Sequence, residues 1–505
     1  MTVRSRYPVA REFVAVLLAA LVFLITAFAP WHAELLVRRA TAVVLATLTL
    51  WITEAAPLGI TGLLIPVAAT LAGVLTWTES LAAWGDPILF LFLGAFLLAR
   101  ALDKHGAFEF LIRARWAQRL RGGHGAGLAA GVMLVAGLVS TVQSNTAVAA
   151  MMLPAVVALA RTVRNPPLVL LALSYGATFG GMATPVGTPP NFIGYGAMRK
   201  LDPTMNFLTW LGVGLPVWAG TCVLAWALVA AARFCGRGTG RGAAAIARAP
   251  GPADTALPEW DGETGICPQT PPTAVQPDAD ATRRAATRRT ARRVAVAAFA
   301  LTVLIWLATG LIASVTQPTD PLQAWVRRYW PESLAPVLTA GVLFMVRVGP
   351  QREPVLDRHD FRVLDWDTLF LIAGGLCLGT MLQVSGAAAA LGAAVGSTSL
   401  PPLVLMFGLG GITVLLSELT SNTATAALMV PIAASLAPAV GMAPVQTIWL
   451  VALCASLGFA LPVSTPPNAI VYGTRLVPLR TMAALGIVLD VLSLIWVVAC
   501  VRWLA

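Results

Sequence analysis

The sequence predicts an all-α polytopic membrane protein with about eleven transmembrane helices in two inverted repeats, each with a re-entrant hairpin and a broken helix. Three observations support this prediction. The chain is poor in charged residues, it contains many long apolar runs, and two short polar motifs occur twice at the same spacing. Together they place most of the chain in lipid and divide it into two related halves.

The amino-acid composition separates this chain from soluble proteins. Of its 505 residues, 58% are apolar and only 11% are charged, whereas soluble proteins carry about 25% charged residues. Size does not explain the deficit, because a large soluble protein still needs a polar surface. Several apolar runs reach the roughly 20 residues that cross a hydrocarbon core. These nearly uncharged runs are residues 12–30, 40–57, 58–77, 88–102, 205–232, 294–314, 366–384 and 480–501.

The net charge of +11 indicates membrane orientation and not nucleic-acid binding. If the N-terminus is cytoplasmic and the spans alternate, most Lys and Arg residues fall on the cytoplasmic side, which is the bias that sets topology. The protein is therefore expected in the inner membrane, with its C-terminus outside. The first apolar run resembles a signal peptide, but its length and the spans behind it favour an uncleaved helix.

A stretch of different composition divides the chain. Residues 235–293 are rich in Gly, Ala, Pro, Thr and Arg and contain few aliphatic side chains. Such a segment cannot bury enough apolar area to fold, so we predict a flexible basic cytoplasmic linker. Its basic end either acts only as a topology signal or also contacts anionic headgroups. The expected domains are N-terminal scaffold helices at 1–83, a first repeat at 84–234, scaffold helices at 294–365, and a second repeat at 366–505 that ends in a helix at 480–504.

Two polar motifs occur once in each half of the chain. The Ser-Asn-Thr-Ala motif at 144–147 recurs at 421–424, and the Thr-Pro-Pro-Asn motif at 188–191 recurs at 465–468. Both recurrences have an offset of 277 residues, and the two Asn residues lie 46 residues apart in each half. Two uncommon motifs in common register indicate a duplicated unit, whereas a repeat array would require more copies.

Each repeat is expected to contain a hairpin that does not cross the membrane and a helix that is interrupted. Apolar runs too short to span flank each Ser-Asn-Thr motif, which predicts re-entrant hairpins at 125–162 and 402–438. The Pro-Pro-Asn motifs interrupt the helices predicted at 167–198 and 445–475. Because the hairpins do not cross, each repeat has an odd number of spans, and the two halves lie inverted in the membrane.

The helix interruptions predict an anion-binding site. A helix that ends inside lipid leaves backbone groups unsatisfied, at a cost of several kcal/mol each, unless a ligand pairs with them. Ser, Asn and Thr favour helix N-caps, and with free N–H groups and the helix dipole they hold a carboxylate without a basic side chain. Proline suits the first turn of the helix that follows. The predicted anion-binding residues are Ser144, Asn145, Thr146, Thr188 and Pro189, with Ser421, Asn422, Thr423, Thr465 and Pro466.

The same interruptions predict two cation sites. Helix C-terminal carbonyls and neutral Ser and Asn oxygens suit a small monovalent ion, whereas calcium would require several carboxylates. An isolated Ser-Asn-Thr would indicate helix–helix contacts, but paired copies in register favour binding, as in transporters built from broken helices. The first predicted site comprises Ser140, Ser144, Asn145 and the carbonyl of Gly187. The second comprises Ser417, Ser421, Asn422 and the carbonyl of Ser464.

Acidic residues inside apolar runs are functional candidates, and Glu54 and Glu418 qualify. Glu54 closes an apolar run and is compatible with an interfacial position. Glu418 adjoins the second Ser-Asn-Thr motif, and two roles remain open for it: proton coupling, or a structural hydrogen bond to a hairpin end that satisfies a buried carboxylate.

Enzymatic chemistry is not indicated. No glycine-rich loop ends in Gly-Lys, which excludes a P-loop pump. The four histidines and six cysteines show no zinc or disulfide spacing. No nucleophile–base pair can be proposed, so we do not expect an enzyme, an organic cofactor or a nucleic-acid partner.

The paired motifs resemble the divalent anion/sodium symporter (DASS) family of dicarboxylate, citrate and sulfate carriers. The resemblance covers almost the whole chain and rests on the Ile-Thr-Glu-Ala-Ala-Pro stretch at 52–57, both Ser-Asn-Thr hairpins, and the segments 187–191 and 461–468. It implies a homodimer joined by scaffold helices and an elevator-type movement of a transport domain. It also implies that the Ser-Asn-Thr motifs contact substrate carboxylates and that flanking groups hold sodium. The family often has Thr where this chain has Ser417, and the linker lies outside the resemblance.

The resemblance implies sodium-coupled import of a C4-dicarboxylate such as succinate, malate or fumarate. A divalent anion that enters against a negative-inside potential costs about 2.3 kcal/mol per charge per 100 mV, and cotransported cations offset that cost. One alternative is a sodium-independent anion exchanger or a sulfate carrier of the same fold. An alternative from another class is an anion channel, but channels usually form pores by symmetric assembly, which an inverted repeat within one chain argues against.

Overall fold

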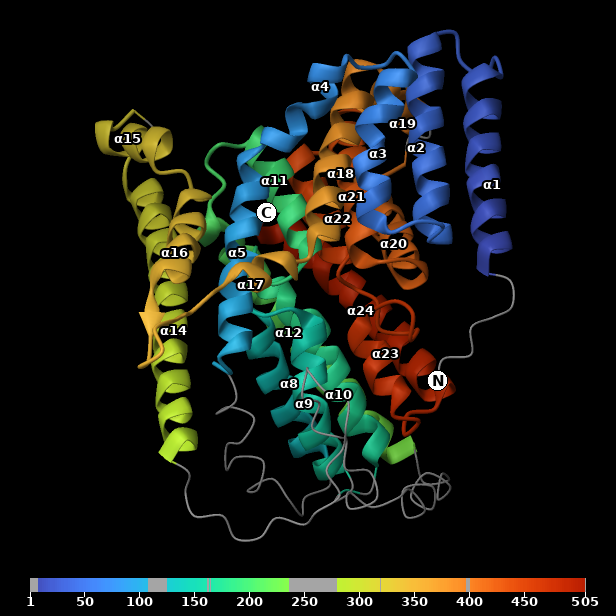
Figure 1. The fold of residues 1–505 in the computed structure, drawn as a ribbon. Coiled ribbons are helices and arrows are strands. Elements are labelled where there is room, and N and C mark those ends of the chain that lie inside the picture. The colour runs from blue at the N-terminus through green and yellow to red at the C-terminus, as the bar shows by residue number, and fades with distance from the viewer. Residues whose placement is uncertain are drawn as a thin grey trace.

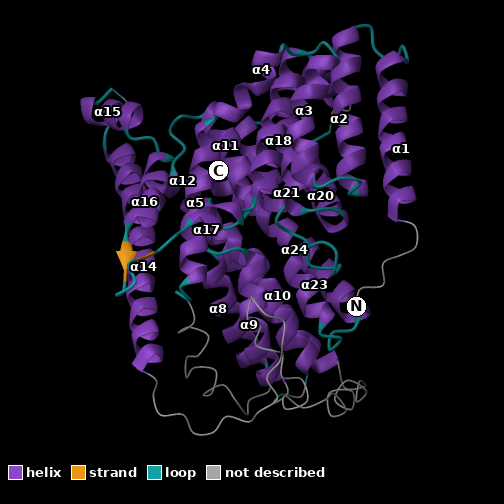
Figure 2. Cartoon of the chain, in the orientation of Figure 1, coloured by secondary structure: helices purple, strands orange, loops and turns teal. Residues whose placement is uncertain are grey.

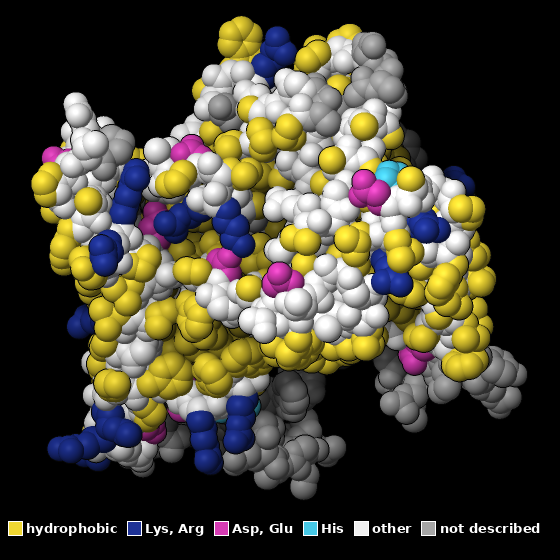
Figure 3. All heavy atoms as spheres, turned by 90° about the horizontal axis from the view of Figure 1, so that it is seen from above, with side chains coloured by type: hydrophobic (Ala, Val, Ile, Leu, Met, Phe, Trp, Pro, Cys, Tyr) yellow, Lys and Arg dark blue, Asp and Glu magenta, His cyan; other side chains and the backbone are white. Residues whose placement is uncertain are grey.

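The computed structural model of the chain is a bundle of α-helices with one two-stranded hairpin (Figures 1 and 2). It describes residues 8–107, 125–160, 163, 165–235, 279–317, 319–396 and 400–504. Among these residues, seven helices are long and apolar enough to cross a membrane, or up to eight if one bent pair forms a single span. Hydrophobic side chains cover much of the periphery when the molecule is seen from above (Figure 3). The chain is therefore a multi-pass membrane protein.

The N-terminal quarter forms helices that pack beside the second half. The helix α18 (Trp366–Val384) crosses next to α3, and glycines at the crossing let the two backbones touch. A proline after an aspartate N-cap starts α5, since Asp86 accepts a hydrogen bond from the Ile88 N–H. These helices are α1 (Pro8–Phe28), α2 (Leu35–Thr53), α3 (Leu58–Leu71), α4 (Trp77–Ala82) and α5 (Pro87–Lys104).

The first half has the interruptions that the motifs predict. The residues 141–144 separate α8 from α9, and a 3₁₀ turn followed by residues 184–188 separates α10 from α11. The helices α8 and α10 pack closely, because Gly180 has no side chain to keep them apart: a Cβ there would lie 2.4 Å from the Gly137 carbonyl. The bounds are α8 (Ala126–Ser140), α9 (Asn145–Ala160), α10 (Pro166–Gly180), α11 (Pro189–Leu201) and α12 (Phe207–Cys235).

The second half has the same order of elements after four additional helices and the hairpin. Thr420 and Ser421 separate α20 from α21, and residues 455–465 separate α22 from α23. The helices before the repeat are α14 (Ala279–Val315), α15 (Pro321–Tyr329), α16 (Leu334–Met345) and α17 (Arg358–Arg362), with strands β1 (Arg347–Val348) and β2 (Glu353–Pro354). The remaining elements are α18, α19 (Ala387–Gly396), α20 (Pro402–Leu419), α21 (Asn422–Leu436), α22 (Pro444–Cys454), α23 (Pro466–Gly473) and α24 (Leu479–Leu504).

The predicted linker is wrong at its C-terminal end. The prediction placed a flexible segment at 235–293, but α14 begins at Ala279, so residues 279–293 are helical and continue into a span. Composition alone missed this, because the segment is rich in Ala and Arg, which favour helices even when they bury little apolar area. Residues 236–278 lie outside the described part of the chain.

A buried carboxylate joins α5 to the short helix α17. The Asp360 side chain is fully buried and lies 3.0 Å from Arg100 Nε and 2.6 Å from Lys104 Nζ. Asp357 caps α17 and also contacts Lys104 at 3.0 Å, but its side chain is 43% exposed. Burial tends to raise the pKa of Asp357, yet the hydrogen bonds from Lys104 and two backbone N–H groups outweigh this and lower it.

We expect Asp360→Asn to lower the stability of the protein by about 1.5–3 kcal/mol, because it removes the buried negative charge that accepts hydrogen bonds from the partly exposed Arg100 and Lys104. The melting temperature in detergent, followed by tryptophan fluorescence, would measure this loss. Asp357→Asn is the matched control and should cost less than about 1 kcal/mol, since an exposed ion pair contributes little. Equal losses in the two variants would contradict the assignment of Asp360 as the junction.

Candidate functional site

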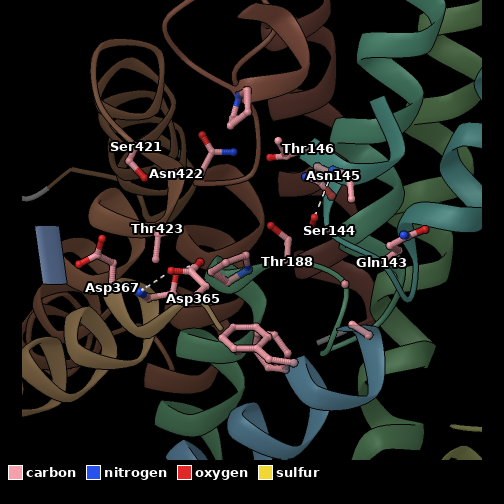
Figure 4. A pocket seen from close by; sticks show the side chains of 18 of the residues that line it. Gln143, Ser144, Asn145, Thr146, Thr188, Asp365, Asp367, Ser421, Asn422 and Thr423 are labelled. Atoms are coloured by element: carbon pink, nitrogen blue, oxygen red, sulfur yellow. Dashed lines mark hydrogen bonds between the residues drawn. The ribbon is translucent and has the colours of Figure 1, made fainter. Parts of the chain in front are cut away.

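A cavity of about 880 Å³ opens between residues of the two halves. The N-terminal ends of α9, α11, α21 and α23 all contribute to its wall, and Figure 4 shows the two Ser-Asn-Thr motifs on neighbouring parts of it. Every residue predicted to bind the anion lines this cavity. They are Ser144, Asn145, Thr146, Thr188, Pro189, Ser421, Asn422, Thr423, Thr465 and Pro466, and Gly187 and Ser464 line it as well.

The first predicted cation site is a cluster of neutral oxygen atoms behind the cavity wall. Ser140 is buried at the end of α8, and its Oγ lies 2.6 Å from Asn145 Oδ1 and 2.6 Å from the Ala177 carbonyl oxygen. The amide of Asn145 donates to the Thr178 carbonyl at 3.3 Å. Because one hydroxyl hydrogen serves two acceptor oxygens, the cluster has more acceptors than donors, as a cation site requires.

The second predicted cation site has the same arrangement. The Oγ of the buried Ser417 lies 2.7 Å from Asn422 Oδ1 and 2.8 Å from the Ala455 carbonyl oxygen. Ser417 and Asn422 each follow their counterparts in the first half, Ser140 and Asn145, by 277 residues. The sequence repeat is thus also a repeat of hydrogen bonds. Asn145 and Asn422 line the cavity. Ser140 and Ser417 are buried and do not line it.

The Asn residue of each Pro-Pro-Asn motif braces the helix interruption. In the first half the Asn191 amide donates to the carbonyls of Gly181 and Thr184, at 2.9 and 2.8 Å. In the second half the Asn468 amide donates to the carbonyls of Gly458 and Leu461, at 3.1 and 2.9 Å. These bonds satisfy carbonyls that the broken helices expose, so the loops keep their shape inside the protein.

The position of Gly187 places its carbonyl near the first cluster. A Cβ built on Gly181 would lie 2.9 Å from the Gly187 oxygen and 3.1 Å from Asn145 Oδ1, so these two oxygens converge on one spot. Two further oxygen atoms, Thr178 Oγ1 and Asn191 Oδ1, are buried and have no hydrogen-bond partner. In the sequence they lie a few residues from Gly181 and Gly187, respectively. Hydroxyl, amide and carbonyl oxygens of this kind fit a small monovalent cation better than a divalent one.

Several charged residues that line the cavity lie outside the motifs recognised in the sequence. The cavity wall includes Arg100 and Asp103 from α5, and Asp365 and Asp367 from the start of α18. These residues line the same cavity as the repeated Ser-Asn-Thr and Thr-Pro-Pro-Asn motifs. Figure 4 shows Asp365 and Asp367 close to Thr423. Arg100 is held by Asp360, and Asp365 caps α18 through the Thr368 N–H at 3.0 Å. Asp103 accepts a hydrogen bond from Gln143, so Arg100, Asp103 and Asp365 each have a structural partner, and the neutral motif residues remain the groups suited to an anion.

The two acidic residues singled out from the sequence lie in different places. Glu54 lines the cavity at the end of α2, where its backbone is left-handed with φ of 49°. Glu418 points away to the second interruption and accepts hydrogen bonds from the N–H groups of Ala460 and Leu461, at 2.8 and 3.0 Å. The structural hydrogen bond that was one of the two alternatives for Glu418 is therefore present.

Comparisons with known proteins point to transport. A family model described as citrate transporter matches residues 48–455. Two relatives named sodium-dependent dicarboxylate transporter SdcS, from Staphylococcus aureus strains bovine RF122 / ET3-1 and NCTC 8325 / PS 47, are each 26% identical over 518 residues. These alignments cover 98% of this chain and 91% of each relative.

Two solved transporter structures give weaker likenesses. The YdaH transporter of Alcanivorax borkumensis is 14% identical with a TM-score of 0.46, and the alignment covers 98% of this chain and 97% of that one. The MtrF structure of Neisseria gonorrhoeae, from a class of antimetabolite efflux pumps, is 12% identical with a TM-score of 0.47, at coverages of 99% and 96%. Both TM-scores are too low to indicate the same fold.

Proposed function

This chain belongs to the citrate transporter family, and from that premise we propose that it imports C4-dicarboxylates such as succinate, malate or fumarate together with sodium. Family membership confirms the resemblance to the divalent anion/sodium symporters. Relatives that align along 98% of the chain are named sodium-dependent dicarboxylate transporters, which supports this substrate class and this coupling ion.

The observation that supports the proposal best is that both Ser-Asn-Thr motifs line one cavity. Each motif starts a helix, α9 or α21, so unpaired N–H groups and the positive end of a helix dipole are available from both halves. A dicarboxylate has two carboxylates, and each motif would hold one of them. Thr146 and Thr423 supply hydroxyl donors, and Thr188 and Thr465 add hydroxyls from the second motif.

Sodium ions would occupy the two oxygen clusters next to the cavity. The first cluster is formed by Ser140, Asn145 and the Gly187 carbonyl, with Ser144 at its edge. The second is formed by Ser417, Asn422 and the residues Ser421 and Ser464. Each Asn lines the cavity while its Oδ1 contacts the Ser hydroxyl, so an ion held there would lie close to a bound carboxylate and offset its charge.

The finer architecture belongs to the same proposal. The seven or eight spans found by length would be joined by shorter apolar helices, such as α3 and α16, to give about eleven. The 277-residue offset of matching hydrogen bonds supports two repeats, which we propose to be inverted, with re-entrant hairpins at α8–α9 and α20–α21. An elevator movement, a homodimer joined by scaffold helices, a cytoplasmic N-terminus and an outside C-terminus complete the proposal.

Uptake of labelled succinate into proteoliposomes tests this function. We expect saturable uptake that requires an inward sodium gradient, because two cations offset the charge of the dianion. Uptake that needs internal anion but no sodium would identify an exchanger and overturn the coupling. Uptake without saturation would identify a channel, and no uptake of succinate, citrate or sulfate would reject the proposed transport.

A further inference from the structure

The C-terminal half of α11 is held by a buried glutamate from a distant part of the chain. Glu332 lies in the connection between α15 and α16, and its side chain is only 8% exposed. Its Oε2 accepts a hydrogen bond from the hydroxyl of Tyr195, and Arg199 Nη1 donates to the same oxygen at 3.3 Å. Its Oε1 accepts the N–H of Phe207, the first residue of α12, at 3.1 Å. These bonds, which we call the Glu332 anchor, join α11 and α12 to the α15–α16 connection.

The backbone of Glu332 is fixed as well. Its carbonyl oxygen accepts a hydrogen bond at 2.9 Å from the indole N–H of Trp306, a buried side chain on α14. The ring of Trp306 stacks on the ring of Phe207, with their centroids 4.9 Å apart. Because both the side chain and the main chain of Glu332 have partners, the end of α11 cannot shift relative to α14 without breaking these contacts.

The other end of α11 is part of the cavity wall. Thr188 and Pro189, at its N-terminal end, line the cavity. The helix also packs against α21 and α22 of the second half. Its contact with α22 is close, since a Cβ built on Gly194 would lie 2.4 Å from the Cβ of Ala452. A close-packed interior transmits a displacement along a helix, so the position of Thr188 depends on how the far end of α11 is held.

Among the described residues, the corresponding helix of the second half, α23, has no such anchor. Tyr472 on α23 follows Tyr195 by 277 residues, but Tyr472 is 38% exposed whereas Tyr195 is 1% exposed. Within the described ranges the hydroxyl of Tyr472 makes no hydrogen bond. The counterpart of Arg199 is Leu476, which cannot pair with a carboxylate. The repeated unit therefore folds without an anchor on this helix, and Glu332 has a role beyond forming the repeat.

We propose that Glu332 is a positioning residue for the anion site, which holds α11 so that Thr188 stays in the cavity wall. Glu332 is not among the described residues that line the cavity, so it acts through α11. A carboxylate suits this role, because hydrogen bonds to a charged group are about twice as strong as those between neutral groups. If the anchor is weakened, α11 occupies this position for less of the time, and the apparent affinity of the cavity for the anion falls by the same factor.

Hydrogen exchange of the purified protein in detergent tests the anchor and does not depend on transport. We expect the backbone N–H groups of α11 to exchange at least about threefold faster in Tyr195→Phe and in Glu332→Gln, because each change removes a hydrogen bond or a charge that opposes local opening. Tyr472→Phe is the matched control, since it removes the same hydroxyl group at the repeat-related position, and it should leave the exchange of α11 unchanged. Unchanged exchange in both Tyr195→Phe and Glu332→Gln, or the same acceleration in Tyr472→Phe, would overturn the proposal. Tyr195→Phe loses only a hydroxyl group, so it tests the anchor even if Glu332→Gln fails to fold.

The concentration dependence of succinate uptake gives the second readout, and this arm alone rests on the proposed function. We expect Tyr195→Phe to raise the succinate concentration for half-maximal uptake by about 3- to 10-fold, because the binding-competent position of α11 is populated less. The maximal rate should stay within about twofold of wild type, since bound succinate selects that position. A lower maximal rate with unchanged half-saturation would assign Tyr195 to stability alone and overturn the positioning role. Faster exchange of α11 in Tyr195→Phe, with no succinate uptake by the wild type, would reject the proposed substrate and still confirm the anchor.

Discussion

Replacing Asn145 or Asn422 with alanine is expected to reduce sodium-coupled uptake by roughly 10- to 100-fold. Each change removes an oxygen that contacts a buried Ser hydroxyl and that faces the cavity. Losing one hydrogen bond or ligand to a charged group costs about 1.5–3 kcal/mol, which corresponds to this range. Initial rates of succinate uptake, measured over a range of sodium concentrations, would show the loss and a higher sodium requirement.

A matched control separates this effect from a general loss of folding. Asn206 caps the start of α12 through the N–H groups of Leu208 and Thr209, outside the cavity wall, so Asn206→Ala should keep most of the transport. The size-exclusion profile of each variant should match that of the wild type. Wild-type uptake in both Asn145→Ala and Asn422→Ala would refute the assignment of these residues to the binding site. An equal loss of uptake in Asn206→Ala would attribute the loss to reduced folding stability.

The second large effect is expected from Gly187→Ala, which should abolish measurable uptake. A Cβ at Gly187 would lie 2.3 Å from the Gly181 carbonyl oxygen and 2.7 Å from its Cα. Because both contacts are to backbone, the interruption between α10 and α11 would have to shift, and with it the carbonyl that faces Asn145. Uptake and sodium-dependent thermal stabilisation would both measure the loss.

The second half of the chain provides the control for this steric argument. Gly458 is the counterpart of Gly181, yet a Cβ there would meet its nearest neighbours at 3.4–3.5 Å, which is ordinary contact. The counterpart of Gly187 is Ser464, which already has a side chain. Gly458→Ala should therefore retain uptake within about threefold, at a cost below 1 kcal/mol. A severe loss in Gly458→Ala with normal uptake in Gly187→Ala would contradict the geometry.

The sequence predicted the structural features that short local motifs determine. The start of α9 at Asn145 and of α21 at Asn422 lies within the Ser-Asn-Thr motifs, because these residue types favour helix N-termini. The interruptions before Pro189 and Pro466 follow from proline at the first turn of a helix. The register of the two halves then predicted which residues meet at one cavity, and the structure brings them together there.

The other features of the site depend on contacts between residues far apart in the sequence, which no local sequence pattern predicts. Arg100, Asp365 and Asp367 reach the cavity wall only because α5 and α18 pack beside the motif helices. Asp490 is buried in the apolar run 480–501 and met the same criterion as Glu54 and Glu418, but the sequence-based prediction did not include it. The prediction missed the first residues of α14 because it relied on their low content of aliphatic side chains. It did not consider the high helix propensity of their Ala and Arg residues.

A cryo-EM map of the reconstituted protein with succinate and sodium tests the central claim most directly. The account predicts that density for the dicarboxylate lies between the N-terminal ends of α9 and α21, in contact with Thr146 and Thr423. It also predicts ion density within about 2.5 Å of Asn145 Oδ1 and Asn422 Oδ1, a distance typical of a small cation and an oxygen ligand. Succinate bound outside this cavity, or in contact with the motif of one half alone, would contradict it.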